Sequence, residues 1–379
     1  MYEVDLTNPD VIRDPFTAYR RAREAAPVVR LNIPGMPMWA LTRHADARAV
    51  LTDPRFAITS SSFVGIPGVP EGYDAYLHTM SELDGPDHLR LRRLAAPAFT
   101  ARRAQDFRPS VEPIAEKLLA TLPSEPDLLR DFAKPLPMHV ICELVGIPAA
   151  ERAAWVEWGA IVAAFDAPRL GEAVPGIIES ARSAVAARPE TGLLADLVRA
   201  EDRLTDTELV TLVWHVVLAG QTPANLIANA VAELWTRPDV LAALRADPSL
   251  LPGAVDELMR WCGPQLLTVP RSATEDVDLL GTTVKAGEPV TVAIAAVNRD
   301  PEAFPDPDRF DITRGAATHL GFGHGPHFCL GAAHARVQTE VALSALLVRD
   351  LTLAVDPAEL RAPDPGTWRL TALPVRVGE

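Results

Sequence analysis

Cysteine is scarce in this chain. Only Cys142, Cys262 and Cys329 occur among 379 residues, and their spacing is not that of a disulfide framework. This scarcity excludes a small disulfide scaffold and favours a reducing compartment. Positive charge is also in the minority, because 36 Lys and Arg stand against 50 Asp and Glu and give a net charge of −14. An acidic chain argues against nucleic acid or an anionic membrane as its main partner.

Leader signals and long hydrophobic runs are missing as well. The N-terminal stretch has neither a signal-peptide core nor an anchor. The longest apolar segment, near Leu209 to Gly220, contains His215 and is too short to span a bilayer. No Ser/Gly-rich linker and no internal repeat interrupts the chain. We therefore expect one large domain over residues 1–379, in the cytoplasm and not on a membrane.

One of the three cysteines lies in a Gly-rich sequence. Cys329 is in the loop FGHGPHFCLG, which runs from Phe322 to Gly331 and leads into an amphipathic segment, Ala332 to Leu347. A helix N-terminus offers unpaired N–H groups and the positive end of a dipole, and both lower the pKa of a thiol. The sequence therefore predicts a thiolate ligand at Cys329, in a loop whose glycines let the backbone approach a flat group.

The spacing Phe322-x-x-Gly325-x-x-x-Cys329-x-Gly331 resembles the haem-binding loop of cytochromes P450. The resemblance implies haem b, iron protoporphyrin IX, with Cys329 as the axial metal ligand and Phe322 and Gly331 beside the ring. Two alternatives stay open: a zinc site formed with neighbouring histidines, or an inert buried cysteine. A structural zinc site usually has paired ligands such as C-x2-C, and Cys329 has no such partner in sequence.

Four further residues match positions that hold the haem carboxylates in that family. His88 and Arg92 are four apart on a predicted helix that begins near Asp84, so they share one face. Arg271 and His327 match the two other carboxylate-binding positions, and a guanidinium fork suits a carboxylate. Without the resemblance, His88 and Arg92 would equally suit a basic surface facing solvent.

A Glu-x-x-Arg pair, Glu257 and Arg260, lies one helical turn apart, and the segment PDPDRF supplies Arg309. The resemblance implies that these three residues form a buried charge triad near the haem loop. Its role would be structural, because removal of one partner leaves a buried charge. An exposed ion pair of the same residues would contribute little.

A capping box, Thr205-x-x-Glu208, opens a helical pattern that reaches about Thr236. In cytochromes P450 this long helix passes over the haem and carries Ala-Gly-x-acid-Thr, in which the acid and the alcohol deliver protons to oxygen. The resemblance therefore predicts a proton-delivery segment in the middle of this helix.

This chain departs from that pattern, because it reads Ala219-Gly220-Gln221-Thr222-Pro223 and keeps no carboxylate in either possible register. We predict Gln221 and Thr222 as the catalytic residues and Ala219 as a haem contact. Pro223 cannot donate a hydrogen bond to the carbonyl of Ala219, so a kink is expected there. An ordinary proline kink without a role in catalysis is the alternative.

Substrate-contacting residues are predicted in four segments. The stretch 57–76 is rich in Gly, Pro and Ser yet carries large apolar side chains, so we expect it to cover a cavity. His215 shares a helix face with Thr222, although a core histidine is an equal alternative. The predicted lining residues are Phe63, Val64, His215, Leu266, Leu267, Val269 and Trp368.

The local patterns predict helices and a few short strands. Expected helices cover 14–25, 111–122, 129–145, 149–164 and 177–187, and expected strands cover 28–31, 38–42, 277–283, 289–294 and 351–355. The first two strands are separated by Pro34-Gly35 and are expected to form a hairpin. The fold is therefore expected to be mainly α with a small β region. The resemblance implies the cytochrome P450 fold, with haem between the long central helix and the Cys329 loop.

The resemblance also implies a monooxygenase that hydroxylates or epoxidises a medium-sized apolar or aromatic small molecule, a natural-product intermediate that is free or bound to a carrier protein. Electrons from NAD(P)H would arrive through ferredoxin reductase and ferredoxin, which would dock on Arg90, Arg93, Arg102 and Arg103. The missing acid favours oxidative coupling or desaturation as an alternative. A non-catalytic haem sensor, an activator of a partner enzyme and a zinc protein are remoter alternatives.

Overall fold

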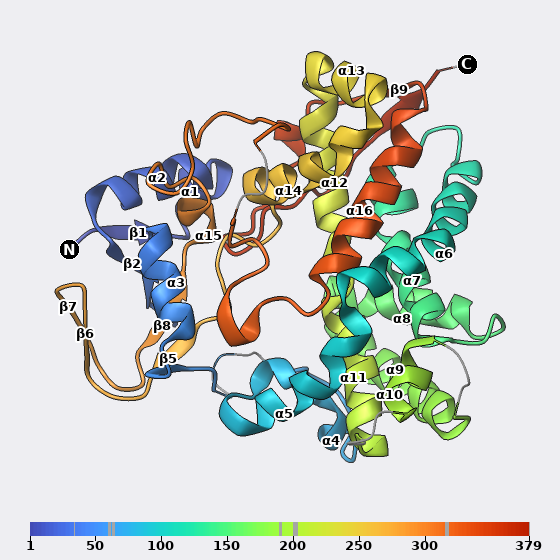
Figure 1. Ribbon diagram of the computed structural model, residues 1–379, viewed down its shortest axis with the longest axis horizontal. Helices are drawn as coiled ribbons and strands as arrows, with labels where there is room; N and C mark the ends of the chain where they lie inside the picture. The colour runs from blue at the N-terminus through green and yellow to red at the C-terminus, as the bar shows by residue number, and fades with distance from the viewer. Residues whose placement is uncertain are drawn as a thin grey trace. The chain divides into compact units, whose positions relative to one another are not determined.

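A computed structural model describes residues 1–33, 35–59, 62, 65–188, 192–199, 204–314 and 318–378. The chain forms two compact units, each assembled from separate stretches of sequence. The first unit comprises Met1–Phe63, Ala228–Cys329 and Thr352–Leu373, and the second Val64–Ile227, Leu330–Leu351 and Pro374–Glu379. The described elements are mostly helices with small sheets, as predicted (Figure 1). A single domain over 1–379 stays a prediction.

The first unit contains a six-stranded sheet in the order β1-β2-β3-β8-β5-β4. Its strands are β1 (Glu3–Asp5), β2 (Val28–Asn32), β3 (Met38–Leu41), β4 (Phe56–Ala57), β5 (Arg271–Ala273) and β8 (Pro289–Val292). β2 and β3 form the predicted antiparallel hairpin, with Val28 opposite Leu41. β8 runs parallel to β3 and antiparallel to β5, so this sheet joins the N-terminal stretch to residues more than halfway along the chain.

Apolar clusters cover both faces of this sheet. Along β3, Trp39 and Leu41 belong to one buried cluster, whereas Met38 and Ala40 belong to another. Successive side chains of a strand point to opposite faces, so the sheet is buried on both sides. The helices of this unit are α1 (Pro9–Arg13), α2 (Pro15–Ala25), α3 (His44–Thr52), α13 (Pro238–Ala246), α14 (Leu251–Cys262) and α15 (Ile294–Val297).

One predicted strand is instead a hairpin. β6 (Val277–Leu279) and β7 (Thr282–Val284) pair antiparallel with each other. Leu280 and Gly281 form the turn, with φ of 54° and 83°. The prediction of one strand over 277–283 was wrong because the turn was not recognised. Such a turn usually has Asn or Gly at its first position, which here is occupied by Leu280.

The second unit is helical. Its helices are α4 (Asp74–Leu77), α5 (Gly85–Ala95), α6 (Ala101–Ala120), α7 (Pro135–Val145), α8 (Arg152–Ala164), α9 (Ala167–Ala186), α10 (Gly192–Arg199), α11 (Asp206–Ala219) and α16 (Ala332–Leu347). α16 packs along α6, and α11 packs against α9. Trp155 and Trp214 are fully buried in its core. Ile66, Val69 and Tyr73, from the loop expected to cover a cavity, pack against the same core.

The predicted capping box is confirmed, because Thr205 Oγ1 accepts from the Glu208 N–H at 3.2 Å and Glu208 Oε2 accepts from the Thr205 N–H at 2.8 Å. The predicted long helix is divided into α11 and α12 (Pro223–Trp235). The 30 residues from Asp206 to Trp235 are long and apolar enough to cross a membrane, but half of their most apolar window is buried inside the protein. Core helices of globular proteins meet the same criterion. The described part of the chain also contains short strands β9 (Leu351–Leu353) and β10 (Val375–Val377) and several short 3₁₀ or π-helical turns.

Candidate active site

The loop that carries Cys329 is folded back on itself. The Cys329 N–H donates to the carbonyl of Phe322 at 2.8 Å, which closes the loop just before α16. Two turns inside it depend on Gly323 and Gly325, whose φ values are 74° and 72°. Glycine adopts this left-handed region without steric cost. The sequence pattern of glycines and one cysteine therefore specifies the conformation of the loop.

Burial separates Cys329 from the two other cysteines. Burial raises the pKa of the Cys142 thiol to about 12 and that of the Cys262 thiol well above its ordinary value, so both remain protonated near neutral pH. Cys329 is exposed. An inert buried cysteine at position 329, which the sequence left open, is excluded.

The donor set at this loop fits a group held by one thiolate. Within the described part of the chain, Cys329 belongs to no group of three or more His, Cys, Asp or Glu side chains close enough to share a metal ion. A structural zinc site requires four ligands, so zinc is disfavoured. At Gly331 a Cβ would meet no atom within 4 Å, so the glycine leaves open space beside the cysteine loop. These residues fit haem ligated by a cysteine thiolate.

The other face of the loop rests on α3. A Cβ added to Gly325 would lie 2.8 Å from Thr52 Cγ2 and 2.9 Å from the carbonyl oxygen of Leu51. The same carbonyl accepts a hydrogen bond from Arg271 Nη1 at 2.9 Å, and Arg271 is buried. The end of α3 thus fixes both the cysteine loop and Arg271, a predicted carboxylate-binding residue.

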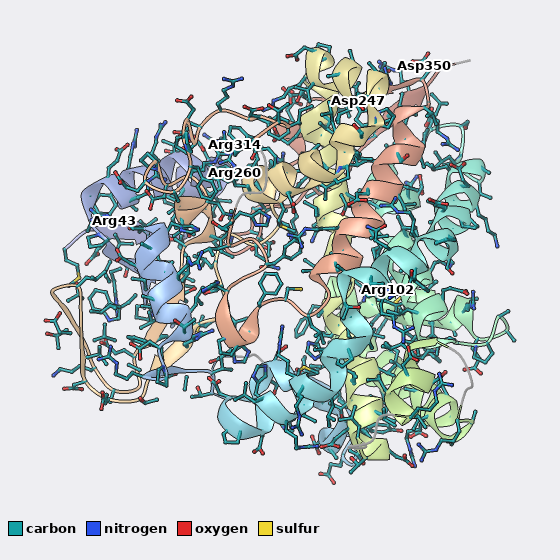
Figure 2. The ribbon with its side chains drawn as sticks, viewed as in Figure 1. Arg43, Arg102, Asp247, Arg260, Arg314 and Asp350 are labelled. Carbon is teal, nitrogen blue, oxygen red and sulfur yellow. The ribbon has the colours of Figure 1, made fainter. Side chains whose placement is uncertain are left out.

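The Glu-x-x-Arg pair is buried, as predicted. Arg260 donates from Nε and Nη2 to the two carboxylate oxygens of Glu257, each at 2.7 Å, and their side chains are 0% and 2% exposed. The third member is Arg314, whose Nε lies 3.3 Å from Glu257. Arg260 and Arg314 are labelled in Figure 2. The prediction of Arg309 was wrong: its side chain is 69% exposed and lies 3.7 Å from Asp311.

Asn298 connects this triad to the cysteine loop. Its carbonyl accepts from Arg260 Nη1 at 2.9 Å, and its Oδ1 accepts from the N–H of Leu320 at 2.7 Å. Leu320 in turn accepts from the Gly323 N–H at 2.9 Å. The triad therefore supports the base of the loop through one side chain. Sequence reasoning missed Asn298 and Arg314, because each is a single polar residue outside any periodic pattern.

His88 and Arg92 share a face of α5 in the second unit. Asp84 caps this helix, since its side chain accepts from the Gly85 N–H. His88 is 1% exposed. Burial lowers the pKa of His215 on α11, and both residues are near enough to it to make a smaller contribution in the same direction. A basic surface facing solvent is excluded for His88.

The break between α11 and α12 is stabilised by two side chains. Pro223 has no N–H, and the carbonyl of Ala219 accepts instead from Thr222, from its N–H at 3.3 Å and from its hydroxyl at 3.0 Å. Gln221 Nε2 donates to the carbonyl of Val217 at 3.1 Å. The predicted kink is thus a break between two helices. The side chains of both predicted catalytic residues, Gln221 and Thr222, donate a hydrogen bond to a carbonyl of α11.

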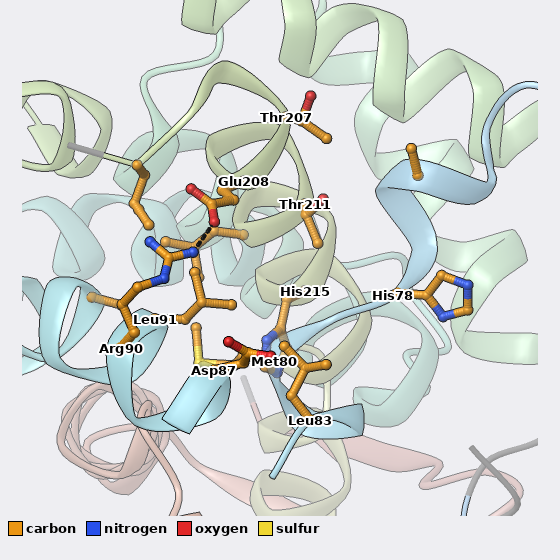
Figure 3. A pocket seen from close by; sticks show the side chains of 14 residues that line it. His78, Met80, Leu83, Asp87, Arg90, Leu91, Thr207, Glu208, Thr211 and His215 are labelled. Carbon is orange, nitrogen blue, oxygen red and sulfur yellow. Dashed lines mark hydrogen bonds and ion pairs between the residues drawn. The ribbon is translucent and has the colours of Figure 1, made fainter. Parts of the chain in front are cut away.

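His215 lines a cavity of about 250 Å³ formed by residues of α11, of α5 and of the segment 75–83 that precedes α5 (Figure 3). Its Nε2 is 2.9 Å from Ser81 Oγ, and its Nδ1 is buried without a partner among the described residues. Burial, with a smaller effect of Arg92 and His88, lowers the His215 pKa to about 4. The ring is therefore neutral near pH 7. The ion pair of Arg90 with Glu208 closes one side of the cavity.

The remaining predicted pocket residues fall in different places. Leu266 is 2% exposed and belongs to the core of the first unit, so its prediction as a pocket residue was wrong. Leu267 packs against the same core. Val269 is 42% exposed and free to contact a ligand. Phe63 and Val64 lie outside the described residues.

The structure also places three other predicted residues. Phe322 packs against Phe328, with ring centroids 6.4 Å apart, inside the cysteine loop. Trp368 packs edge-on against Phe16 at 5.1 Å and lines a separate cavity of the first unit. His327 lies in the short helical turn Gly325–His327 of the cysteine loop.

The predicted docking arginines are mostly engaged with acids of their own unit. Arg90 pairs with Glu208, and Arg103 lies 3.1 Å from Asp196. Arg102 is 91% exposed and 3.8 Å from its i+4 neighbour, an aspartate. These arginines therefore offer a partner less positive charge than their number implies.

Comparison with known proteins places these features in a family. The family model for cytochrome P450 matches residues 172–374. The chain is 41% identical over 384 residues to cytochrome P450 monooxygenase PikC of Streptomyces venezuelae, which covers 97% of this chain and 92% of that protein. It is 40% identical over 361 residues to mycinamicin IV hydroxylase/epoxidase of Micromonospora griseorubida, with 90% of each chain covered.

A solved structure agrees. P450BioI in complex with acyl carrier protein ligated to hexadec-9Z-enoic acid matches with a TM-score of 0.85 and 31% identity. The match covers 97% of this chain and 100% of that one. The similarity therefore extends over almost the whole chain.

Proposed function

Because the chain belongs to the cytochrome P450 family and is a haem-dependent monooxygenase, we propose that Cys329 is the axial thiolate of haem b and that the enzyme oxidises an apolar or aromatic small molecule. The observation that carries this proposal is the exposed Cys329 in a closed glycine loop, in contrast to Cys142 and Cys262, which are buried and remain protonated. Haem with a thiolate ligand activates dioxygen, since the thiolate donates electron density that favours O–O cleavage.

The chain's own residues hold the cofactor in this proposal. A guanidinium binds a carboxylate with two parallel hydrogen bonds, and a buried histidine adds a third donor. The assigned residues are His88, Arg92, Arg271 and His327 for the haem carboxylates, and Ala219, Phe322 and Gly331 for contact with the ring. Arg271 is supported by its fixed position on the α3 carbonyl that also contacts the loop.

The proposed substrate is a medium-sized natural-product intermediate, and the proposed reaction is hydroxylation or epoxidation. The name of mycinamicin IV hydroxylase/epoxidase supports this reaction class by similarity. P450BioI was solved with an acyl carrier protein, which supports a carrier-bound substrate as one form. His215, Leu267 and Val269 are the residues proposed to contact it.

Proton delivery distinguishes this site. Gln221 and Thr222 each donate a hydrogen bond to a carbonyl of α11, and neither is a carboxylic acid. Water or a hydroxyl of the substrate must therefore supply the protons that an acid would otherwise deliver. The same departure from the acid–alcohol pattern is the observation behind a second candidate function, oxidative coupling or desaturation, in which the substrate loses hydrogen and gains no oxygen.

Electrons are proposed to come from NAD(P)H through ferredoxin reductase and ferredoxin in the cytoplasm. Arg90, Arg93, Arg102 and Arg103 are the proposed docking residues, and the side chain of Arg102, which is 91% exposed, supports the proposal most directly. Electrostatic docking of this kind affects the association rate and weakens with salt.

The experiment is turnover of the haem-loaded protein with a surrogate ferredoxin, its reductase and NADPH. Macrolactones and aromatic intermediates are first screened by the spin-state shift of the Soret band, and products of binding compounds are identified by mass. A product with one added oxygen atom supports monooxygenation, whereas a product that has lost two hydrogens supports the second function. Binding compounds that never yield either product contradict both.

A further inference from the structure

A second cavity lies in the first unit, apart from every residue assigned to the haem. It has a volume of about 290 Å³ and is formed by the start of α2, the residues at the end of α12, and α14. That volume is at the lower end of the range of small-molecule sites. Its aromatic lining residues are Phe16, Trp261 and Trp368.

Hydrogen-bond donors in this cavity outnumber the acceptors left to receive them. Arg299 Nε and Trp368 Nε1 are buried without a partner among the described residues. A buried donor without a partner is costly, so such groups usually mark a water, an ion or a ligand. Both of these residues line the cavity. A ligand that satisfies them must carry acceptor oxygens.

The carboxylates that line the cavity are already engaged. Glu233 Oε2 accepts from Arg237 at 2.6 Å and from the indole N–H of Trp261 at 3.0 Å. Asp14 Oδ1 accepts from a backbone N–H and caps α2. Asp308 is shared between Arg299 at 3.5 Å and Arg20 at 3.9 Å. None of these acids satisfies the two buried donors.

The charged side chains that line the cavity balance, because Arg20, Arg237 and Arg299 stand against Asp14, Glu233 and Asp308. Arg361 lies 4.1 Å from the centre of the Trp368 ring and 3.8 Å from Glu233. Burial lowers the pKa of Arg299 to about 10 and also lowers that of Arg361. The Arg299 guanidinium lies 3.8 Å from the Trp261 ring centre and 4.2 Å from that of Phe16, which fixes its plane.

We propose that this cavity binds a small carboxylate with a flat apolar body. The carboxylate accepts hydrogen bonds from Arg299 Nε and Trp368 Nε1, and the body lies along the aromatic wall. A guanidinium held between two rings is prepositioned for such a ligand. The proposal is independent of the proposed oxidation, because none of these residues is assigned to the haem and Trp368, which the sequence predicted to line the substrate pocket, lines this separate cavity instead.

The probe is benzoate, with benzamide as its neutral analogue. Ligand-observed NMR titrations of the haem-loaded protein measure binding, and the Soret band monitors binding at the haem. The expected result is saturable benzoate binding without a Soret change, and binding of benzamide at least tenfold weaker. No saturable binding, equal binding of benzamide, or a Soret shift that follows the titration would overturn the proposal.

Two variants identify the site. Trp368→Phe keeps a ring and removes one donor, and it should weaken benzoate binding at least threefold. Arg20→Gln removes a charge from an exposed side chain and should also weaken benzoate binding. This variant provides the test if Trp368→Phe does not fold. Trp158→Phe, a matched change in the second unit, should leave the affinity as in the unsubstituted protein. Unchanged affinity in both Trp368→Phe and Arg20→Gln contradicts the assignment.

Discussion

Gly325 lies directly against the main-chain carbonyl of Leu51, and a Cβ at position 325 would stand 2.9 Å from that oxygen. Gly325 also has a φ of 72°, which side-chain-bearing residues rarely adopt. The carbonyl is the acceptor for Arg271, so it cannot move away without breaking that hydrogen bond. One contact therefore holds the cysteine loop, α3 and a proposed carboxylate-binding arginine in place.

The glycines of this loop should respond differently to alanine. Gly325→Ala should lower the free energy of unfolding by about 2 kcal/mol or more, through overpacking and backbone strain. Gly331→Ala should change it by less than about 0.5 kcal/mol, because φ is −84° there and no neighbour is met, yet it should lower the haem content. Urea unfolding and the ratio of Soret to protein absorbance measure the two effects. Full haem content in Gly331→Ala would contradict a ring beside Gly331.

The triad gives a graded series of substitutions. Arg260→Met should cost about 3–5 kcal/mol, since it leaves Glu257 buried without its bidentate partner. Arg309→Met is the matched control and should cost less than about 0.5 kcal/mol, because that side chain is exposed. Arg314→Met should lie between them. Chemical unfolding measures all three, and a loss in Arg309→Met as large as in Arg314→Met would restore the original assignment.

Thr222 should matter for stability through its hydroxyl. Thr222→Val removes the hydrogen bond to the Ala219 carbonyl and should cost about 1 kcal/mol, whereas Thr222→Ser should retain most of it. Thermal unfolding of both variants decides this. A larger loss in the serine variant than in the valine variant would show that the methyl group, not the hydroxyl, is what the helix break requires.

Gln221→Glu tests the missing acid. A carboxyl facing the Val217 carbonyl is favoured in its protonated form, which can donate where a carboxylate cannot, so its pKa should be raised. More oxygenated product and less peroxide per NADPH are therefore expected. Gln221→Met is the control, because the methionine side chain has no N–H or O–H proton to donate. If Gln221→Glu and Gln221→Met leave the same peroxide yield, position 221 does not govern proton delivery.

His334 should make the protein sensitive to acid. It lies beside Phe99 in the second unit, and burial lowers its pKa to about 4. In the unfolded chain His334 has an ordinary pKa of about 6.5, so between that pH and about 4 it is protonated in the unfolded chain and neutral in the folded one. Stability therefore falls as pH drops from about 6.5 towards 4, by up to about 2 kcal/mol between pH 7 and pH 5. His334→Leu should flatten this part of the profile in urea unfolding, and an unchanged slope would exclude His334 as the cause.

Local rules predicted the parts of the fold that depend on neighbouring residues. Thr205 and Glu208 form their capping box, Asp84 caps α5, and Glu257 with Arg260 forms a buried pair, because a single helical turn specifies each. The predicted hairpin at β2 and β3 follows from two apolar runs and a Pro-Gly turn.

Tertiary contacts decided what the sequence could not. Arg309 and Arg314 are both arginines of one loop, and only the path of that loop selects Arg314 as the partner of Glu257. Leu266 has the apolar character of a pocket residue, but the sheet buries it in the core. The sequence predicted only a kink at Pro223 where the structure has a helix break. It did not show that the Thr222 hydroxyl would donate to the Ala219 carbonyl, to which Pro223 cannot donate.

The central claim is that Cys329 ligates the haem iron. The direct measurement is the absorption spectrum of the reduced protein with carbon monoxide, compared with Cys329→His. The unsubstituted protein should show the red-shifted Soret band of thiolate-ligated haem, and Cys329→His should show an imidazole-type band or lose the haem. A thiolate band that persists in Cys329→His would contradict the account.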